Sequence, residues 1–286
     1  MLPFVSEDPT ERRAGLYDTG KTTLYACKAD PRFSYGLYVP PDMATREDQP
    51  NLIVSVHGTL RKQTSYRDAF SEFGRYNNCV VLAPLFPVGV RGDDAADGYK
   101  YLLEGEIRYD LVLLEMVEEV ERRLRRAFPK FMMFGFSGGG HFTHRFLYLH
   151  PERLKAVSIG APGSVTLLDD TKDWWVGIRD VREKFGKDIN FTALGNVKAH
   201  CVVGHADRET WEITHKPGGP HYMEGANDAG SNRIERAQSL IASLSEHGMD
   251  TRLDLAPGIS HSMSGIVPFA QDFFLDVLRT ESRGAS

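Results

Sequence analysis

The chain of 286 residues is long enough to bury a large core, and single α/β domains of this length are common. Its formal net charge is −5, so its overall charge does not favour binding to nucleic acid. The one basic cluster, ERRLRRAF at 121–128, ends an amphipathic helical pattern that carries glutamates just upstream. We therefore interpret it as a solvated helix face with ion pairs four residues apart.

Cysteine content and the lengths of the apolar runs indicate the compartment. Cys27, Cys79 and Cys201 are too few and too scattered for a disulfide framework or a zinc site. The first residues lack the basic start and long apolar run of a secretory signal, and no stretch is long enough to cross a bilayer. We therefore expect a cytoplasmic protein that binds neither membrane nor nucleic acid. The oligomeric state is left open, with a homodimer as one option.

Strand and helix patterns alternate along the chain. The run at 34–41 ends at two prolines, which is typical of an edge strand. Continuous β-branched or apolar runs then predict strands buried on both faces, and apolar residues at helical spacing predict the helices. The remaining strands are expected at 51–58, 79–84, 130–136, 154–163, 197–207 and 251–258, and the helices at 66–76, 106–128, 139–150 and 231–247.

The helix at 231–247 has well-defined ends. Asn232 can cap its first turn, Glu235 completes a capping box, and Gly248 can supply the left-handed stop. The alternation as a whole predicts a mostly parallel sheet with helices on both faces. We therefore expect a three-layer α/β/α sandwich formed by one domain over residues 1–286.

The connection at 163–196 is much longer than a crossover between neighbouring strands requires. It contains Trp174 and Trp175, which we expect to open a short helix. Because the segment leaves the carboxyl end of a strand, it must emerge at the edge of the sheet where ligands bind in open α/β folds. We expect it to form a lid over a pocket; the alternative is an extra surface helix.

The segment Gly135-Phe136-Ser137-Gly138-Gly139 fits the pattern G-x-S-x-G, with a predicted strand before it and a predicted helix after it. That context is typical of a nucleophile elbow, in which a sharp turn leaves room only for glycine two residues either side of the serine. The turn lifts the serine hydroxyl to the carboxyl edge of the sheet, at the positive end of the helix. Ser137 is therefore the candidate nucleophile.

A serine nucleophile requires a histidine to accept its proton and a carboxylate to orient that histidine. His261 follows the final predicted strand, and Asp207 follows the preceding one, so both are expected at the edge that carries Ser137. The order serine, acid, histidine is that of α/β hydrolases. Other acids that could replace Asp207 stay open, namely Glu209, Asp228, Asp169 and Asp170.

Through these motifs the chain resembles the α/β-hydrolase superfamily, and within it the esterase branch related to feruloyl esterases and polyhydroxybutyrate depolymerases. The resemblance runs from FSYGLYVPP through VHGT, GFSGGGHF and VVGHAD to GISHS. It implies Ser137 as nucleophile, His261 as general base and Asp207 as the orienting acid. It also implies an oxyanion hole formed by the backbone N–H groups of Gly138 and Thr59, with Leu60 as an alternative to Thr59.

Several further histidines are given structural roles. His57 is expected to brace the loop that carries Thr59, and His141 and His144 are expected to be packed or capping residues. The spacing of histidines and acids at 205–215 matches no zinc signature. We expect neither a metal nor an organic cofactor.

The loops at 82–94 and 215–230 and the tryptophan pair are expected to surround the pocket. Trp174, Trp175 and Phe136 are the candidate substrate-binding residues. The mixture of aromatic, apolar and charged residues favours a medium-sized, partly aromatic carboxylic ester as the small-molecule substrate. The same machinery would serve an amidase, a lactonase, a carbon–carbon bond hydrolase or an acyltransferase. A non-catalytic binding protein on the same fold is the alternative from another class.

Overall fold

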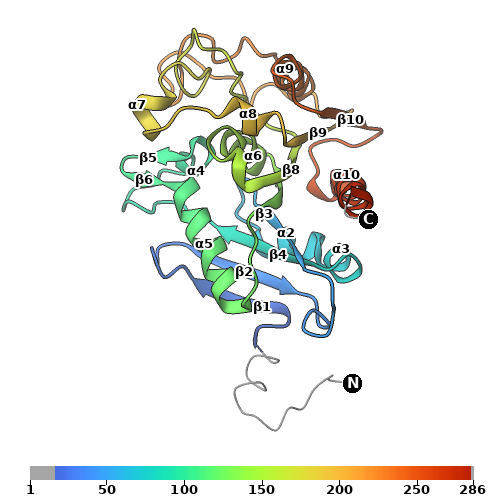
Figure 1. Cartoon of the computed structure of the whole chain (residues 1–286). Helices are drawn as coiled ribbons and strands as arrows, with labels where there is room; N and C mark the ends of the chain where they lie inside the picture. Colours follow the sequence, from blue (N-terminus) through green and yellow to red (C-terminus); the bar gives the residue numbers. More distant parts are fainter. Residues whose placement is uncertain (1–16, 285–286) are drawn as a thin grey trace.

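A computed structural model describes residues 17–284. Eight strands form one sheet in the order β1-β2-β4-β3-β7-β8-β9-β10 (Figure 1). β2 runs antiparallel to both of its neighbours, and every pair from β4 to β10 is parallel. The predicted mostly parallel sheet is confirmed. Its strands are β1 (Gly20–Ala26), β2 (Ser34–Val39), β3 (Asn51–Val56), β4 (Cys79–Leu85), β7 (Phe131–Phe136), β8 (Leu154–Gly160), β9 (Lys198–Gly204) and β10 (Thr251–Ala256).

Helices cover both faces of the sheet, as Figure 1 shows. The strands β7, β8, β9 and β10 follow one another across the sheet in chain order. Because crossovers between parallel strands are right-handed, the helices that connect these four strands lie on one face of the sheet. The connection from β3 to β4 runs across the sheet in the opposite direction, so α2 and α3 lie on the other face. α10 lies on that face too, where Gln271 donates a hydrogen bond to Ala69 O of α2 at 2.9 Å. The helices are α2 (Gln63–Ala69), α3 (Ser71–Tyr76), α4 (Gly98–Tyr101), α5 (Tyr109–Leu124), α6 (Gly138–Leu149), α7 (Val181–Phe185), α8 (Phe191–Leu194), α9 (Arg233–Glu246) and α10 (Met263–Gly284).

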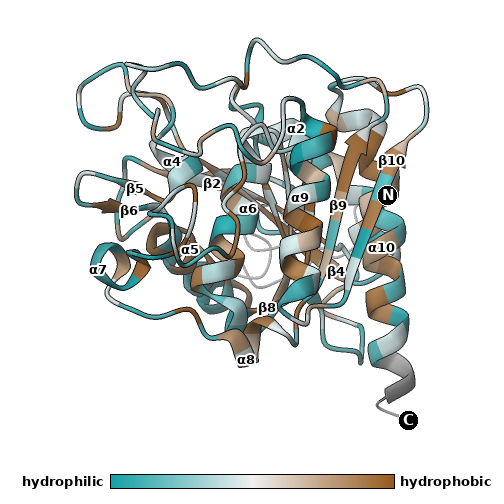
Figure 2. Ribbon diagram, turned by 90° about the horizontal axis from the view of Figure 1, so that it is seen from above, coloured by the Kyte–Doolittle hydropathy of each residue, from teal (hydrophilic) through white to brown (hydrophobic). Residues whose placement is uncertain are grey.

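The core lies between the sheet and these two helical layers. Hydrophobic residues run along the central strands, and the hydrophilic faces of the helices point outward (Figure 2). β3, β4 and β7 are buried almost throughout, as expected for parallel strands covered on both faces. Among the described residues, no helix is both long and apolar enough to cross a membrane.

The structure corrects three of the predicted elements. The strand predicted at the edge, β2, is covered by β1, whose polar and mostly exposed sequence GKTTLYA carries little strand signal. The helix predicted at 66–76 is two short helices, α2 and α3, that meet at the buried Phe70. The helix predicted from 106 begins at Tyr109, because residues 103–108 form a small hairpin of β5 (Leu103–Glu104) and β6 (Ile107–Arg108).

The predicted ends of the 231–247 helix are confirmed in α9. Asn232 Oδ1 accepts hydrogen bonds from the N–H groups of Ile234 at 3.0 Å and Glu235 at 3.1 Å. Glu235 Oε2 accepts from the N–H of Ser231 at 2.7 Å, one residue before the expected partner. Gly248 adopts a φ of 81°, the left-handed conformation that ends a helix.

Candidate active site

Ser137 lies in a sharp turn between β7 and α6. Its φ of 56° and ψ of −118° belong to a region that residues other than glycine rarely occupy. Its N–H donates to Gly160 O of β8 at 2.8 Å, and its carbonyl accepts from the His141 N–H at 3.1 Å. The turn is therefore fixed to the neighbouring strand on one side and to the first turn of α6 on the other.

The glycines on either side of Ser137 are required by close backbone contacts. A Cβ on Gly135 would stand 2.1 Å from Gly139 O, and a Cβ on Gly139 would stand 2.2 Å from Val56 O of β3. Both distances are far below van der Waals contact, so any larger residue would push β3, β7 and α6 apart. The G-x-S-x-G pattern is thus a packing requirement of this turn.

The loops after β9 and β10 bring Asp207 and His261 together. The N–H of His205 donates to Ala256 O at 2.9 Å, and the N–H of Ala206 donates to Ile259 O at 2.8 Å. In the resulting arrangement His261 Nδ1 lies 2.6 Å from Asp207 Oδ2, the contact that the order of the strands predicts. A carboxylate only accepts hydrogen bonds, so Nδ1 is the donor and Nε2 is left as the basic nitrogen.

The ring of His261 lies against Phe136, the residue before Ser137, with ring centroids 4.6 Å apart. Phe136 itself is buried. In the described structure Ser137 Oγ forms no hydrogen bond with His261. Contacts between a nucleophile and its base are commonly long until substrate binds, so the geometry is compatible with a triad.

Arg233, which was not among the predicted site residues, completes the surroundings of Asp207. Its Nη1 donates to Asp207 Oδ1 at 3.1 Å, and its Nη2 donates to Glu212 Oε2 at 2.6 Å. Arg233 is the first residue of α9, and both it and Asp207 are buried. The guanidinium balances the negative charge of the carboxylate that holds His261. Only the helix cap at Asn232 marks this position in the sequence.

The other acids considered for the triad lie elsewhere. Glu209 and Asp170 are exposed. Asp228 accepts a hydrogen bond from Lys172 at 2.9 Å, and Asp169 accepts from the Thr171 N–H at 2.9 Å. Within the described residues none of these four carboxylates is in hydrogen-bonding contact with His261, whereas Asp207 is.

The loop after β3 lies directly beside the serine turn. A Cβ on Gly58 would stand 3.5 Å from Ser137 Cβ and 3.2 Å from Phe136 O, so the loop approaches the turn at backbone distance. The buried His57 donates from Nδ1 to Gly58 O at 2.9 Å and accepts at Nε2 from the Phe86 N–H at 3.0 Å. The predicted bracing role of His57 is confirmed, and burial lowers the pKa of this imidazole to about 4.

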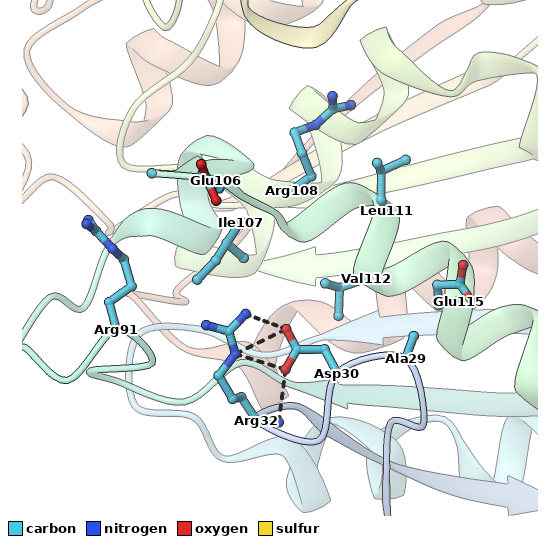
Figure 3. A pocket seen from close by; sticks show the side chains of 11 residues that line it. Ala29, Asp30, Arg32, Arg91, Glu106, Ile107, Arg108, Leu111, Val112 and Glu115 are labelled. Carbon is cyan, nitrogen blue, oxygen red and sulfur yellow. Dashed lines mark hydrogen bonds and ion pairs between the residues drawn. The ribbon is translucent and has the colours of Figure 1, made fainter.

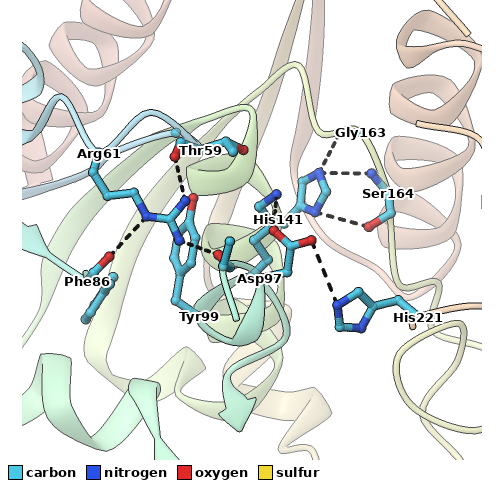
Figure 4. Close-up of polar contacts among 12 residues, drawn as sticks. Thr59, Arg61, Phe86, Asp97, Tyr99, His141, Gly163, Ser164 and His221 are labelled. Carbon is cyan, nitrogen blue, oxygen red and sulfur yellow. Dashed lines mark hydrogen bonds and ion pairs between the residues drawn. The ribbon is translucent and has the colours of Figure 1, made fainter. Parts of the chain in front are cut away.

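Arg61, a residue of the same loop, connects it to the chain around Phe86, as Figure 4 shows. Its guanidinium donates to Thr59 O at 2.5 Å and Phe86 O at 3.2 Å, and it lies over the ring of Tyr99. Thr59 lines the same cavity as Ser137 and Gly138, whereas the Leu60 side chain is 76% exposed. The N–H groups of the first turn of a helix have no acceptor within the helix, so the N–H of Gly138 can serve a ligand.

The cavity beside Ser137 has a volume of about 490 Å³. Its largest contribution comes from residues 211–222, which we call the wall segment. Its aliphatic side chains are Ile213 and Pro220, and apart from three glycines the other lining residues are polar, charged or aromatic. The lining residues are Thr59, Asp97, Lys100, Tyr101, Ser137, Gly138, His141, Gly163, Trp211, Glu212, Ile213, Thr214, His215, Lys216, Gly219, Pro220, His221, Tyr222 and Arg233.

Residues 163–196 contribute Gly163 to this lining, and the tryptophan pair lies behind it. Trp174 and Trp175 are 7% and 6% exposed. Trp175 Nε1 donates to His221 O at 3.1 Å, and its ring centroid lies 4.7 Å from that of His215. The expectation that the pair opens a helix is wrong, because the only helices of this segment begin later, at Val181 and Phe191.

His141 and His144 are buried and hydrogen-bonded, which confirms their packed role. Nε2 of His141 accepts from the N–H groups of Gly163 at 2.7 Å and Ser164 at 3.0 Å (Figure 4). Nε2 of His144 accepts from the N–H of Thr166 at 3.0 Å. Burial lowers the pKa of both imidazoles well below the usual value, with a further contribution from the charge of Arg145.

A second hollow, of about 720 Å³, lies at the start of α5 (Figure 3). It shares no lining residue with the cavity beside Ser137. Its arginines are largely compensated, since Arg32 pairs with Asp30 and Arg108 pairs with Asp110. We therefore assign the candidate active site to the cavity beside Ser137.

Comparisons with known proteins support the fold. No family model matches the chain, and no curated protein sequence matches it. Among solved structures, it is similar to poly(aspartic acid) hydrolase-1 from Sphingomonas sp. KT-1, with a TM-score of 0.72 and 20% identity over 89% of this chain and 98% of that one.

The chain is also similar to a poly(3-hydroxybutyrate) depolymerase from Bordetella parapertussis, with a TM-score of 0.71 and 18% identity over 90% of this chain and 91% of that one. A ferulic acid esterase gives a TM-score of 0.59 and 12% identity over 90% and 96%. At such identities the likeness concerns the fold. The expected resemblance is confirmed at that level: the chain has the α/β-hydrolase fold shared by these esterases and depolymerases.

Proposed function

We propose that the protein is a serine hydrolase that cleaves a carboxylic ester through an acyl-enzyme intermediate. The observation that carries the proposal is the joint arrangement of Ser137 and the hydrogen-bonded pair of His261 and Asp207. Ser137 stands in a strained turn between β7 and α6 that opens on a cavity. Asp207 follows β9 and His261 follows β10, at the same edge of the sheet. The solved structures of similar fold are named as a hydrolase, a depolymerase and an esterase, which supports the same reaction class.

In the first step, Ser137 Oγ attacks the ester carbonyl while His261 Nε2 accepts its proton. Asp207 holds Nδ1–H and stabilises the imidazolium that forms. The negative charge on the carbonyl oxygen is stabilised by the N–H groups of Gly138 and Thr59. His261 then protonates the leaving alcohol, which departs and leaves the acyl group on Ser137.

In the second step, water attacks the acyl carbonyl and gives its proton to His261, and the same two N–H groups stabilise the second oxyanion. Collapse of this intermediate returns the proton to Ser137 Oγ and releases the carboxylic acid. Removing a single oxyanion donor raises the barrier by about 3 kcal/mol in other hydrolases. The acceptor in this proposal is water; transfer to an alcohol or amine uses the same acyl-enzyme.

A cavity of about 490 Å³ fits a small to medium substrate. We expected Trp174, Trp175 and Phe136 to contact the substrate, but none of them is among the lining residues. The aromatic contacts with the substrate come instead from the wall segment, which contributes Trp211 and Tyr222. For residues 163–196 we propose an indirect form of the covering role: Trp175 supports His215 and His221 of the wall segment from behind. The segment then affects substrate preference through the position of that wall.

The test is labelling by a fluorophosphonate, which reacts with activated serines, together with hydrolysis of nitrophenyl esters of increasing acyl length. We expect labelling of the wild-type protein, and its loss in Ser137→Ala and in heat-denatured protein. A modified peptide that contains Ser137 should be found by mass spectrometry. Labelling at another serine, or none together with no ester hydrolysis, would overturn the proposal.

A further inference from the structure

The cavity beside Ser137 carries more positive than negative side chains, although the whole chain carries a net charge of −5. Its lining contains the cations Lys100, Lys216 and Arg233 and the anions Asp97 and Glu212. Two of the cations have partners: Lys100 Nζ lies 2.7 Å from Asp97 Oδ1, and Arg233 is shared between Asp207 and Glu212. Lys216 is exposed and forms no ion pair with any described residue.

Two further arginines are buried immediately behind this lining. Arg145 donates to Thr166 Oγ1 at 2.9 Å, to Ser164 Oγ at 3.2 Å and to Lys100 O at 2.6 Å, and it lies over the ring of Tyr101. None of these acceptors is a carboxylate. Tyr101 and Lys100 both line the cavity, so this buried positive charge stands one residue away from it.

Arg236, the second of these arginines, is also hydrogen-bonded to uncharged acceptors. It donates to the carbonyl oxygens of Ile213 at 2.9 Å and Gly230 at 2.9 Å, to that of Gly163, and to Asn227 Oδ1 at 3.1 Å. Ile213 and Gly163 belong to the cavity lining. No carboxylate among the described residues is within ion-pair distance of Arg145 or Arg236. Buried charges are usually paired, so two unpaired guanidinium groups at one cavity are unusual.

The histidines of the cavity respond to the same positive charge. Burial, and then the charge of Arg236, lowers the pKa of His215 to about 4. Burial, and then the charges of Arg145 and Lys100, lowers the pKa of His141 well below its usual value. Both imidazoles therefore remain neutral, and the excess positive charge comes from the lysines and arginines.

Lys100 brings part of this charge close to the reacting atoms. Its Cε lies 3.0 Å from the position that a Cβ would occupy on Gly138, the residue that follows Ser137. The Lys100 side chain is 13% exposed, so its charge is only partly screened by water. An anionic group of a bound substrate would thus meet Lys216 and the Lys100–Asp97 ion pair directly. Arg145 and Arg236 would act on it from behind the residues that line the cavity.

We propose that the substrate carries a carboxylate, in its acyl or its alcohol portion, which this electropositive cavity recognises. The inference rests on the proposed serine hydrolase and narrows its substrate to anionic esters. The negative group supplies the counter-charge that the protein does not place beside Arg145 and Arg236. Long alkyl esters are disfavoured, because Ile213 and Pro220 are the only aliphatic side chains among the described residues that line the cavity.

The test compares esters that have nearly the same shape and differ in charge. In the acyl portion, mono(4-nitrophenyl) adipate is compared with 4-nitrophenyl 6-methylheptanoate, in which an isopropyl group replaces the carboxylate. In the leaving group, 4-acetoxybenzoate is compared with 4-acetoxybenzamide. We expect kcat/KM to be about tenfold higher for the anionic ester of at least one pair, which corresponds to one well-placed charge contact.

Raising the salt concentration from about 20 to about 500 mM should reduce this preference, because the exposed part of the interaction is screened. Lys216→Gln should reduce the ratio of kcat/KM between the anionic and the neutral ester of a pair about threefold, because it removes the unpaired cation of the lining. The matched control is Lys130→Gln, which removes the same charge from an exposed lysine at the amino end of β7, the opposite end from Ser137. That variant should keep the full preference.

Equal kcat/KM within both pairs, or a preference for the neutral esters, with Ser137 still labelled by the fluorophosphonate, overturns the inference and leaves the proposed hydrolase intact. Loss of all labelling and turnover overturns the hydrolase instead. In that case a binding experiment on the Ser137→Ala protein tests the charge preference of the cavity without any turnover. Adipate should quench the tryptophan fluorescence of this protein, whereas the uncharged adipamide should not. Equal effects of the two compounds would contradict a cavity that recognises carboxylates.

Discussion

The turn that carries Ser137 and the wall segment at 211–222 face each other across one cavity but are held in different ways. The turn is fixed by main-chain contacts: the N–H of Ser137 bonds to β8, and Gly139 approaches Val56 O so closely that no side chain fits. The wall segment contains no helix or strand and presents side chains, among them Trp211 at 75% exposure and Tyr222 at 44%.

This difference separates two requirements of a catalyst. Chemistry at Ser137 requires atoms positioned to a fraction of an ångström, which a turn locked between strands and a helix provides. Substrate selection requires side chains that can vary without disturbing that turn, which a loop provides. Substitutions at the turn should therefore change the rate of the chemical step, and substitutions in the wall should change preference among substrates.

The largest effect is expected for Ser137→Ala. Loss of a triad nucleophile lowers kcat by about a millionfold in a well-studied serine protease, and we expect a fall of that order on any ester the wild type hydrolyses. The fold should persist, because only a hydroxyl is removed from a half-exposed turn. Steady-state kinetics and thermal unfolding measure the two properties. Activity above a few per cent of wild type would remove Ser137 from the mechanism.

Asp207→Asn should follow, with a fall in kcat of about ten thousandfold, because asparagine favours the wrong tautomer of His261. The protein should also lose stability, since Arg233 would keep its buried charge without the Asp207 carboxylate. Glu209→Gln is the matched control, as Glu209 is an exposed acid two residues away. Similar kinetics for the two variants would place the orienting acid at another residue.

The tryptophan pair tests whether the region behind the wall influences specificity. Alanine at Trp174 or Trp175 should lower the free energy of unfolding by about 3 kcal/mol, because both side chains are buried. Only Trp175 contacts His215 and donates to His221 O, so only Trp175→Ala should change the ranking of esters by acyl group. An unchanged ranking in both variants would make residues 163–196 purely structural.

Stability should fall in mild acid because of buried neutral histidines such as His57. Its pKa is about 4 in the folded protein, against about 6.5 in an unfolded chain, so the unfolded state binds more protons between these values. Stability is therefore complete above about pH 6.5 and declines as the pH falls towards 4, by up to about 1.4 kcal/mol per pH unit for each such group.

Thermal unfolding between about pH 7 and pH 4.5 measures this decline. His57→Asn should make the decline shallower, although the variant starts from a lower stability because Phe86 N–H loses its acceptor. His247→Asn, the same substitution at an exposed histidine, is the matched control. Parallel curves for wild type and His57→Asn would show that His57 already titrates normally.

The smallest effect is expected at the wall itself. Trp211 lines the cavity yet is mostly exposed, so Trp211→Ala should leave the melting temperature unchanged and raise KM about threefold for esters with an aromatic leaving group. Trp211→Phe should restore most of the difference, since it keeps an aromatic face. A change in kcat with constant KM would instead connect Trp211 to the chemical step, against the division of roles described above.

Local patterns in the sequence were sufficient for the parts of the molecule that depend on neighbouring residues. The alternation of strands and helices predicts the parallel sheet, and the glycines around Ser137 predict a turn that no other residue fits. The contact of Asp207 with His261 could also be expected, because the carboxyl ends of adjacent parallel strands meet at one edge. Each of these inferences needs only the chain order and the geometry of regular elements.

The tertiary structure alone decided what surrounds these elements. β1 pairs outside β2 although its sequence is polar, because an edge strand needs only its backbone hydrogen bonds. Arg233 reaches Asp207, Trp175 lies behind His215, and Arg145 lies beneath Tyr101 through contacts between distant parts of the chain. Such contacts depend on how the loops fold over the sheet, and no periodic or turn signal encodes them. For this reason the reaction class could be inferred from sequence, whereas the charge and lining of the cavity required the fold.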